Sequence, residues 1–266
     1  MQAVTEAWRN LVAAGARPLA ITNCLNFGNP QRPQVMGQLV GCIEGMAAAC
    51  RALEFPVVSG NVSLYNETDG NAILPTPNVG GVGLIEDLER MVGTAWPVAG
   101  LDLVLLGECL GWLGCSLYWH FLMDRDDGAP PPVDLGGERR TGEFVLEQIA
   151  QGRIKACHDL ADGGLAVAVA EMCLASGMGA RLDAPIDAAS MAGWWFGEEQ
   201  GRYLLAVPAE LTAGLLAAAT AAGVIARTVG RTGGDALIMG AELPISMEAL
   251  RTSHEAWLPA FMAAEI

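Results

Sequence analysis

The stretch VVSGNVSLYNET, residues 57–68, begins as an apolar strand and continues with a row of oxygen-bearing side chains. Gly60 has no Cβ, so a ligand can approach its backbone closely. Asn61 offers a neutral amide oxygen suited to Mg²⁺, a hard cation that takes protein oxygens together with substrate phosphates. Ser63 lies two residues on and therefore on the same face of the strand, and the alternation is expected to continue to Glu67. This pattern predicts a strand end that can hold a nucleotide–metal complex.

The same residue types also suit a strand that ends in an Asn/Asp/Gly turn, and on residue types alone this second interpretation is favoured. A similar stretch, ITNCLNFGNP at 21–30, places three asparagines, among them Asn23, around Gly28. Asparagine is common in turns, so this stretch alone does not distinguish a turn from a binding site. The binding interpretation gains support because one predicted helix, 33–53, separates the two strand ends, which can then face one ligand.

Hydrophobic periodicity predicts a mixed α/β chain. Proline and glycine interrupt that periodicity in MVGTAWPVAGLD, so we expect two lobes, 1–97 and 98–266. The pattern predicts helices at 2–14, 33–53, 111–122, 137–151, 162–176, 209–222 and 246–263, and strands at 18–22, 55–64, 79–87, 103–108, 202–208, 224–231 and 235–240.

The charge balance excludes several classes of partner. With 15 basic and 30 acidic residues the net charge is −15, which disfavours nucleic acid and anionic membranes as partners. Lys155 is the only lysine and follows an isoleucine, so a Walker A loop is excluded. Seven cysteines without a CxxC pair indicate reduced, buried thiols, and the N-terminus lacks the apolar region of a signal peptide. These features predict a soluble, cytoplasmic protein.

Several long strings resemble one enzyme family. The strings are 21–88, GECLGWLGCSLYW, CHDLADGGLAVAVAEM and WWFGEEQGRYLLAV. They are similar to the formylglycinamidine ribonucleotide synthetase family of purine biosynthesis, and the similarity covers nearly the whole chain. It implies part of an ATP-binding lobe followed by a C-terminal α/β lobe of the aminoimidazole ribonucleotide synthetase-like superfold.

The resemblance also implies a reaction and roles for four residues. ATP phosphorylates the amide oxygen of formylglycinamide ribonucleotide, and ammonia then displaces phosphate to give formylglycinamidine ribonucleotide. By position, Gly60 and Asn23 contact ATP, Asn61 binds Mg²⁺ and Ser63 contacts the substrate. Asn23 stands where the family usually has an aspartate, so the hydrogen-bonding oxygen is kept while the charge is lost.

Members of this family carry two copies of the pair of lobes, and this sequence resembles the second copy, entered part-way through its first lobe. The catalytic histidine belongs to a Ser-His-Asn-His-Pro motif of the first copy. His120, His158 and His254 lie outside any such motif, so no catalytic residue is assigned and little activity is expected of the chain alone. The implied partners are the missing N-terminal half, a glutaminase subunit and a small bridging subunit. We also expect self-association through an exposed edge of the first lobe.

The second lobe holds weaker candidates. Asp162 is placed to cap a helix whose GG start leaves backbone N–H groups free for an anion, although a simple capped core helix is favoured. Glu199 and Gln200 resemble a substrate-contacting segment of the first copy and would line a pseudo-symmetric site. His158 is interpreted as a satisfied core histidine. Two alternatives stay open: a non-catalytic nucleotide-binding or assembly module, and a related synthetase or kinase of the same superfold.

Overall fold

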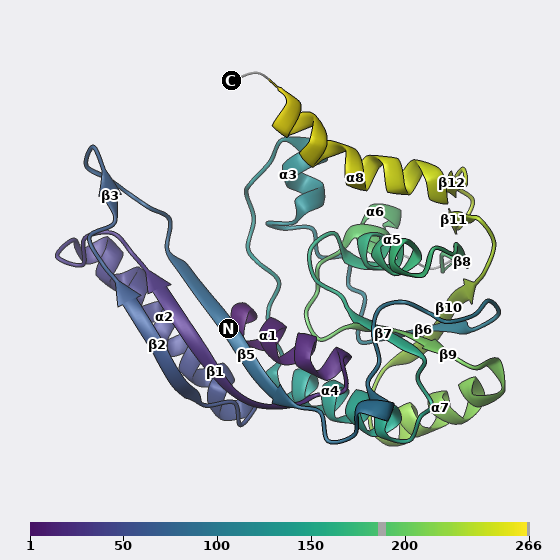
Figure 1. Ribbon diagram of the computed structural model, residues 1–266. Helices are drawn as coiled ribbons and strands as arrows, with labels where there is room; N and C mark the ends of the chain where they lie inside the picture. Colours follow the sequence, from purple (N-terminus) through teal and green to yellow (C-terminus); the bar gives the residue numbers. More distant parts are fainter. Residues whose placement is uncertain (186–189, 265–266) are drawn as a thin grey trace.

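Residues 1–185 and 190–264 are described by a computed structural model, in which helices flank two main sheets (Figure 1). The smaller sheet has the order β2-β1-β5, with β2 parallel and β5 antiparallel to the central β1. A short hairpin, β3 and β4, extends beyond β2. The bounds are β1 (Arg17–Asn26), β2 (Val57–Ser63), β3 (Glu67–Thr68), β4 (Asn71–Ala72) and β5 (Thr76–Leu84).

Helix α2 (Pro33–Ala52) connects β1 to β2, as the parallel pairing of these strands requires. Proline begins the helix, where its missing N–H leaves no hydrogen bond unmade. Met46 and Ala49 are buried in the same apolar cluster as Ile21 of β1. Three apolar side chains of the helix are exposed: Met36, Val40 and Ile43. The first lobe therefore leaves part of its apolar surface uncovered.

The larger sheet has seven strands in the order β12-β11-β8-β10-β6-β9-β7. Its interior strands β6 and β9 pair antiparallel and are buried along their whole length. The strands are β6 (Asp102–Leu106), β7 (Ala156–Asp159), β8 (Ala180–Leu182), β9 (Tyr203–Val207), β10 (Ala226–Thr232), β11 (Ala236–Met239) and β12 (Ile245–Ser246). The helices are α3 (Leu117–Met123), α4 (Leu135–Ala150), α5 (Gly164–Ser176), α6 (Met191–Phe196), α7 (Ala209–Ala221) and α8 (Met247–Ala263), with a 3₁₀ turn at Leu88–Arg90.

Alternate residues of β6 face two different apolar clusters, because successive side chains of a strand point to opposite faces. Leu103 and Leu105 pack with apolar residues of α5 and α6. Val104 and Leu106 pack with residues of α1, α4 and α7, and this second cluster also contains Ile21 of the smaller sheet. One core therefore runs from the first lobe into the second.

Helix α1 (Gln2–Ala13) makes this connection. Val4, Trp8 and Val12 recur at four-residue intervals and are all buried, so one face of the helix is apolar. On the same helix Arg9 is fully buried and pairs with Glu138 of α4, with Nη1 and Oε1 2.7 Å apart. A buried ion pair thus joins the N-terminal helix to the second lobe.

The structure confirms the mixed α/β prediction and most of the longer elements, but corrects two details. The predicted helix over 111–122 begins only at Leu117, because Cys115 has φ +58° and the Ser116 hydroxyl accepts the hydrogen bond that caps α3. Asp162 does not cap α5, whose N-cap is Gly163 with φ +74°. The short elements β7, β8 and α6 had no periodicity long enough to predict them.

The described residues also bear on two expectations from composition. All seven cysteines are free in the structure, but the expectation that they are buried holds only for Cys157 and Cys173, and Cys115 is exposed. None of the helices in the described ranges is long and apolar enough to span a bilayer.

Candidate functional site

The parallel pairing of β1 and β2 brings the two polar strand ends together. In the register, Asn23 lies beside Gly60, and Cys24 lies beside Asn61. Ser63 lies at the end of the same ladder, beside Asn26. The residues predicted from two separate stretches of sequence therefore form one continuous edge at the carboxyl ends of neighbouring strands.

Gly60 is required by its neighbour. A Cβ at this position would collide with both the side-chain Oδ1 and the backbone oxygen of Asn23, because the amide of Asn23 lies across the bare backbone of Gly60. Asn23 itself also lines a shallow apolar groove together with Met46 and Val57. Glycine is needed here for strand packing, whatever its role toward a ligand.

Asn61 and Ser63 point to the opposite side of the strand from Asn23. The Oδ1 atom of Asn61 lies 3.6 Å from the Sγ atom of Cys24, its partner in the register. Asn61 is exposed, whereas Ser63 is half-buried and donates its hydroxyl to Oδ1 of Asn66 at 3.1 Å. A ligand that contacts Asn23, Asn61 and Ser63 together must therefore lie across the strand ends and not along one face.

The alternation predicted to continue to Glu67 is wrong. Strand β2 ends at Ser63, and Tyr65 has φ +60°, which turns the chain away from the strand direction. Glu67 belongs to β3, where its carboxylate accepts from the N–H of Asn29 and pairs with Arg32. It ties the loop after β1 to the hairpin.

Sequence reasoning missed the role of Asn66. Its Nδ2 atom donates to the backbone oxygens of Phe27 and Ser63, both at 3.0 Å, and so joins the ends of β1 and β2. The only signal was an asparagine placed just after a strand, which is typical of side chains that bond to nearby backbone. Asn66 holds the geometry of the edge.

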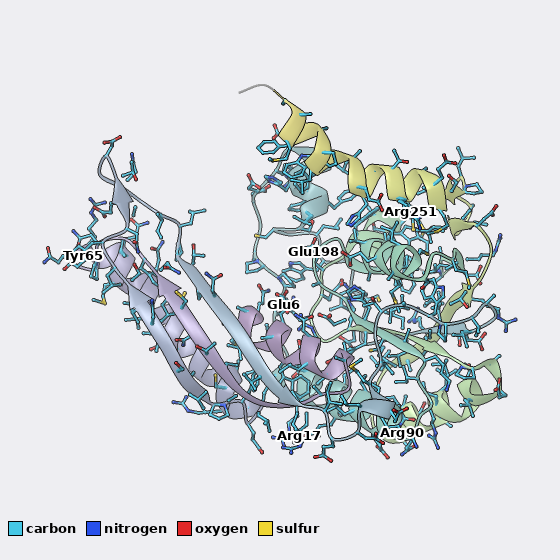
Figure 2. All side chains as sticks on the ribbon, viewed as in Figure 1. Glu6, Arg17, Tyr65, Arg90, Glu198 and Arg251 are labelled. Atoms are coloured by element: carbon cyan, nitrogen blue, oxygen red, sulfur yellow. The ribbon has the colours of Figure 1, made fainter. Side chains whose placement is uncertain are left out.

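The second-lobe candidates lie in a different environment from the strand ends. Figure 2 shows Glu198, the neighbour of Glu199, in the second lobe, far from Tyr65 of the first lobe. The Oε1 atom of Glu198 accepts from the N–H groups of Gly163 and Leu117, at 2.8 and 2.9 Å. The GG turn thus already has a carboxylate partner within the chain, and its first N–H is not free for an anion.

The carboxylate of Glu199 is also engaged by groups of the chain itself. Its Oε1 atom accepts from the N–H of Trp112 at 2.6 Å, and its Oε2 atom lies 3.1 Å from Nη1 of the fully buried Arg202. Gln200 is half-buried and accepts from Arg9 at 3.1 Å. These side chains hold loops and a buried arginine in place.

His158 is a satisfied, largely buried histidine, as predicted. Its Nε2 atom lies 3.0 Å from a carboxylate oxygen of Glu171, and its Nδ1 atom bonds to the backbone oxygen of Asp159. Burial by itself lowers the pKa of His158, but the bonds to Asp159 and Glu171 outweigh it and raise the pKa to about 9. The imidazolium form is therefore the stable one near neutrality.

The atoms that could coordinate a metal ion at the strand ends are amide and hydroxyl oxygens. Within the described residues there is no group of three or more His, Cys, Asp or Glu side chains that could hold an ion. Asn61 presents one neutral oxygen, while the carboxylate of Glu67 is engaged by Arg32. This set fits an ion held mainly by phosphate oxygens, with Asn61 as a single protein ligand.

The chain belongs to the family of AIR synthase related proteins: residues 98–239 match its C-terminal domain and residues 1–85 its N-terminal domain. Comparison with individual proteins gives a more specific match than the family models. It is 52% identical over 99% of its length to phosphoribosylformylglycinamidine synthase subunit PurL of Azorhizobium caulinodans, and covers 36% of that protein. The chain thus spans about a third of the length of the curated relatives it matches.

Solved structures agree on the fold. PurL of T. maritima complexed with ATP has a TM-score of 0.72 and 19% identity, with 94% of this chain and 40% of that chain covered. The same enzyme complexed with FGAR has a TM-score of 0.73 and 19% identity, covering 93% and 42%. The family and the fold class expected from the resemblance are confirmed.

Proposed function

We propose that this chain supplies part of the nucleotide and substrate site of a phosphoribosylformylglycinamidine synthase acting in purine biosynthesis. The amide oxygen of formylglycinamide ribonucleotide attacks the γ-phosphorus of ATP, ADP leaves, and ammonia then displaces phosphate to form the amidine. The observation that carries the proposal is the pairing of the ends of β1 and β2, which places Asn23 and Gly60 on one face and Asn61 and Ser63 on the other. The 52% identity to a PurL subunit supports it.

The roles of these residues follow from their positions. The amide of Asn23 lies across the backbone of Gly60, and we assign this pair to contact the polar groups of ATP. Ser63 is held by Asn66 at the end of the strand, where its hydroxyl can reach a substrate bound beside the nucleotide. The chain's part in the reaction is to bind and orient ATP and the substrate, and such positioning is the main requirement of phosphoryl transfer.

Mg²⁺, when bound with ATP, neutralises charge on the transferring phosphoryl group. Asn61 is the residue of this chain that would hold it, through Oδ1. Because this oxygen is neutral and the nearby Glu67 is paired with Arg32, the phosphates and groups from outside this chain must supply the remaining ligands.

The remaining partners are proposed on the same basis. The N-terminal part of the enzyme contributes the catalytic histidine, a glutaminase subunit supplies ammonia, and a small bridging subunit joins them in the cytoplasm. A non-catalytic nucleotide-binding or assembly module is the competing hypothesis.

Complementation tests the proposal. The chain alone is assayed for ADP release with formylglycinamide ribonucleotide, ATP and ammonia, and then together with the N-terminal part of the Azorhizobium caulinodans relative. We expect little or no turnover alone and ADP release coupled to amidine formation in the mixture. Robust turnover by the chain alone, or an inactive mixture that retains bound ADP, contradicts the proposal, and the second result favours the non-catalytic module.

A further inference from the structure

The second lobe contains a cavity of about 340 Å³ that is separate from the joined strand ends. It lies between the loop after β6, the start of α4 and the turn before β10. Its volume is at the lower end of the range for small-molecule sites. Much of the wall is apolar: Leu110, Trp112, Pro131, Val133, Val224 and Ile225.

A buried carboxylate lines this cavity. Glu138 is 1% exposed, and its Oε1 atom accepts from Nη1 of Arg9 at 2.7 Å. Its Oε2 atom is buried and has no hydrogen-bond partner among the described residues. Burial raises the pKa of Glu138, and Arg9 together with the backbone N–H of Gly201 offsets this only in part. A buried acceptor without a donor is costly, so Oε2 is suited to a ligand that donates hydrogen bonds.

The charges around the cavity favour a cation. Besides Glu138, the lining includes Glu108, Asp134 and Glu199, against the single guanidinium of Arg140. Arg202 pairs with Glu199 and Arg9 pairs with Glu138. Glu108 and Asp134 remain as acidic groups at the rim, against the exposed Arg140. A ligand with a phosphate or carboxylate would meet this negative field, whereas a cation would be stabilised by it.

The indole of Trp112 provides a fixed aromatic wall. Its Nε1 donates to the backbone oxygen of Ala129 at 2.9 Å, and its backbone N–H donates to Glu199 at 2.6 Å. The indole is held by its Nε1 bond and its backbone by Glu199, which keeps the ring in place, and an aromatic face attracts flat cations.

We propose that this cavity binds a small organic cation with a flat apolar body, of the amidinium or guanidinium class. The cation donates to Glu138 and packs its body against Trp112 and the aliphatic wall. The inference goes beyond the proposed function and does not depend on it, because none of the strand-end residues lines this cavity.

Benzamidine is the probe, and its isosteres benzamide and benzoate are the matched neutral and anionic controls. Binding is followed by the indole N–H resonance of Trp112, with the exposed Trp257 as an internal reference. We expect saturable shifts of Trp112 with a Kd of about 1 mM or tighter for benzamidine, and at least about tenfold weaker binding of both isosteres. Equal binding of the three probes, or no benzamidine shift at Trp112, overturns the proposal.

Two variants and one control variant locate the site. Ile225→Trp fills the cavity from its rim and should abolish the shift, whereas Leu243→Trp, at a position 87% exposed outside the lining, should leave it unchanged. Glu138→Gln keeps a hydrogen bond to Arg9 and removes the charge, so benzamidine affinity should fall at least about tenfold. If Glu138→Gln fails to fold, Ile225→Trp decides the question: undiminished binding to this variant contradicts the cavity as the site.

Discussion

The two lobes use their polar side chains in opposite ways. At the ends of β1 and β2, Asn61 is exposed, and its amide oxygen lies 3.6 Å from the thiol of Cys24. In the second lobe, Glu198 and Glu199 are buried, and backbone N–H groups and Arg202 occupy their carboxylates. Asn61 is therefore free to meet a ligand, whereas Glu198 and Glu199 are already committed to the fold.

The difference shows why a motif alone does not identify a site. Glu199 and Gln200 resemble a substrate-contacting segment, yet the contacts that they make here are internal. Asn61 looked like an ordinary turn residue, yet its amide oxygen lies at an exposed strand end. If this contrast is correct, mutations in the second lobe should reduce stability, and mutations at the strand ends should reduce binding.

The largest effect is expected at Arg9. Arg9→Met leaves Glu138 buried without its cation, so the free energy of unfolding should fall by about 3–5 kcal/mol. Urea unfolding followed by circular dichroism measures the change. Arg17→Met is the matched control, because Arg17 is largely exposed and its pair with Glu86 is worth little. Equal effects of the two substitutions would show that the buried pair does not join the lobes energetically.

A smaller loss of stability is expected at Glu198. Glu198→Ala removes the acceptor of two backbone N–H groups, from Gly163 and Leu117, and should lower the free energy of unfolding by about 2–3 kcal/mol. Exposed Glu210 on α7 provides the control variant Glu210→Ala. An unchanged stability together with weaker nucleotide binding would mean that Glu198 serves a ligand.

His158 gives the second lobe a pH-dependent contribution. Because the folded-state pKa is raised to about 9, protonation stabilises the fold fully below the ordinary value of about 6.5, and the contribution disappears as the pH rises through 9. Glu171→Gln should therefore destabilise the protein by about 1–2 kcal/mol at pH 6, allowing for the partial exposure of Glu171. At pH 10 the two proteins should converge in stability, and a difference independent of pH contradicts the ion pair.

Much of the fold was predictable because the long helices carry their own signal. The apolar positions of 33–53 repeat at helical spacing, and α2 spans Pro33–Ala52. The strand-end residues were predictable as a group, because two polar stretches flank one helix. The environment of Glu198 was not, since its partners Gly163 and Leu117 are distant in sequence and meet it only in the folded chain.

Self-association through the first lobe should depend on β2. This strand carries no charged residue, pairs only with β1 in the described part of the chain, and exposes 68% of Val58 and 56% of Val62. We expect oligomers in multi-angle light scattering that Val58→Lys shifts toward monomer. Leu243→Lys, on the second lobe, should not change the mass. A strictly monomeric wild-type protein at high concentration contradicts this expectation.

The most direct test of the joined strand ends is a crystal structure of the chain assembled with the N-terminal part of its relative and soaked with Mg²⁺ and a non-hydrolysable ATP analogue. We predict nucleotide density bordered by Asn23 and Gly60, with the ion near Oδ1 of Asn61, and loss of that density in Asn61→Ala. Solvated strand ends with the nucleotide bound elsewhere would contradict the proposed site.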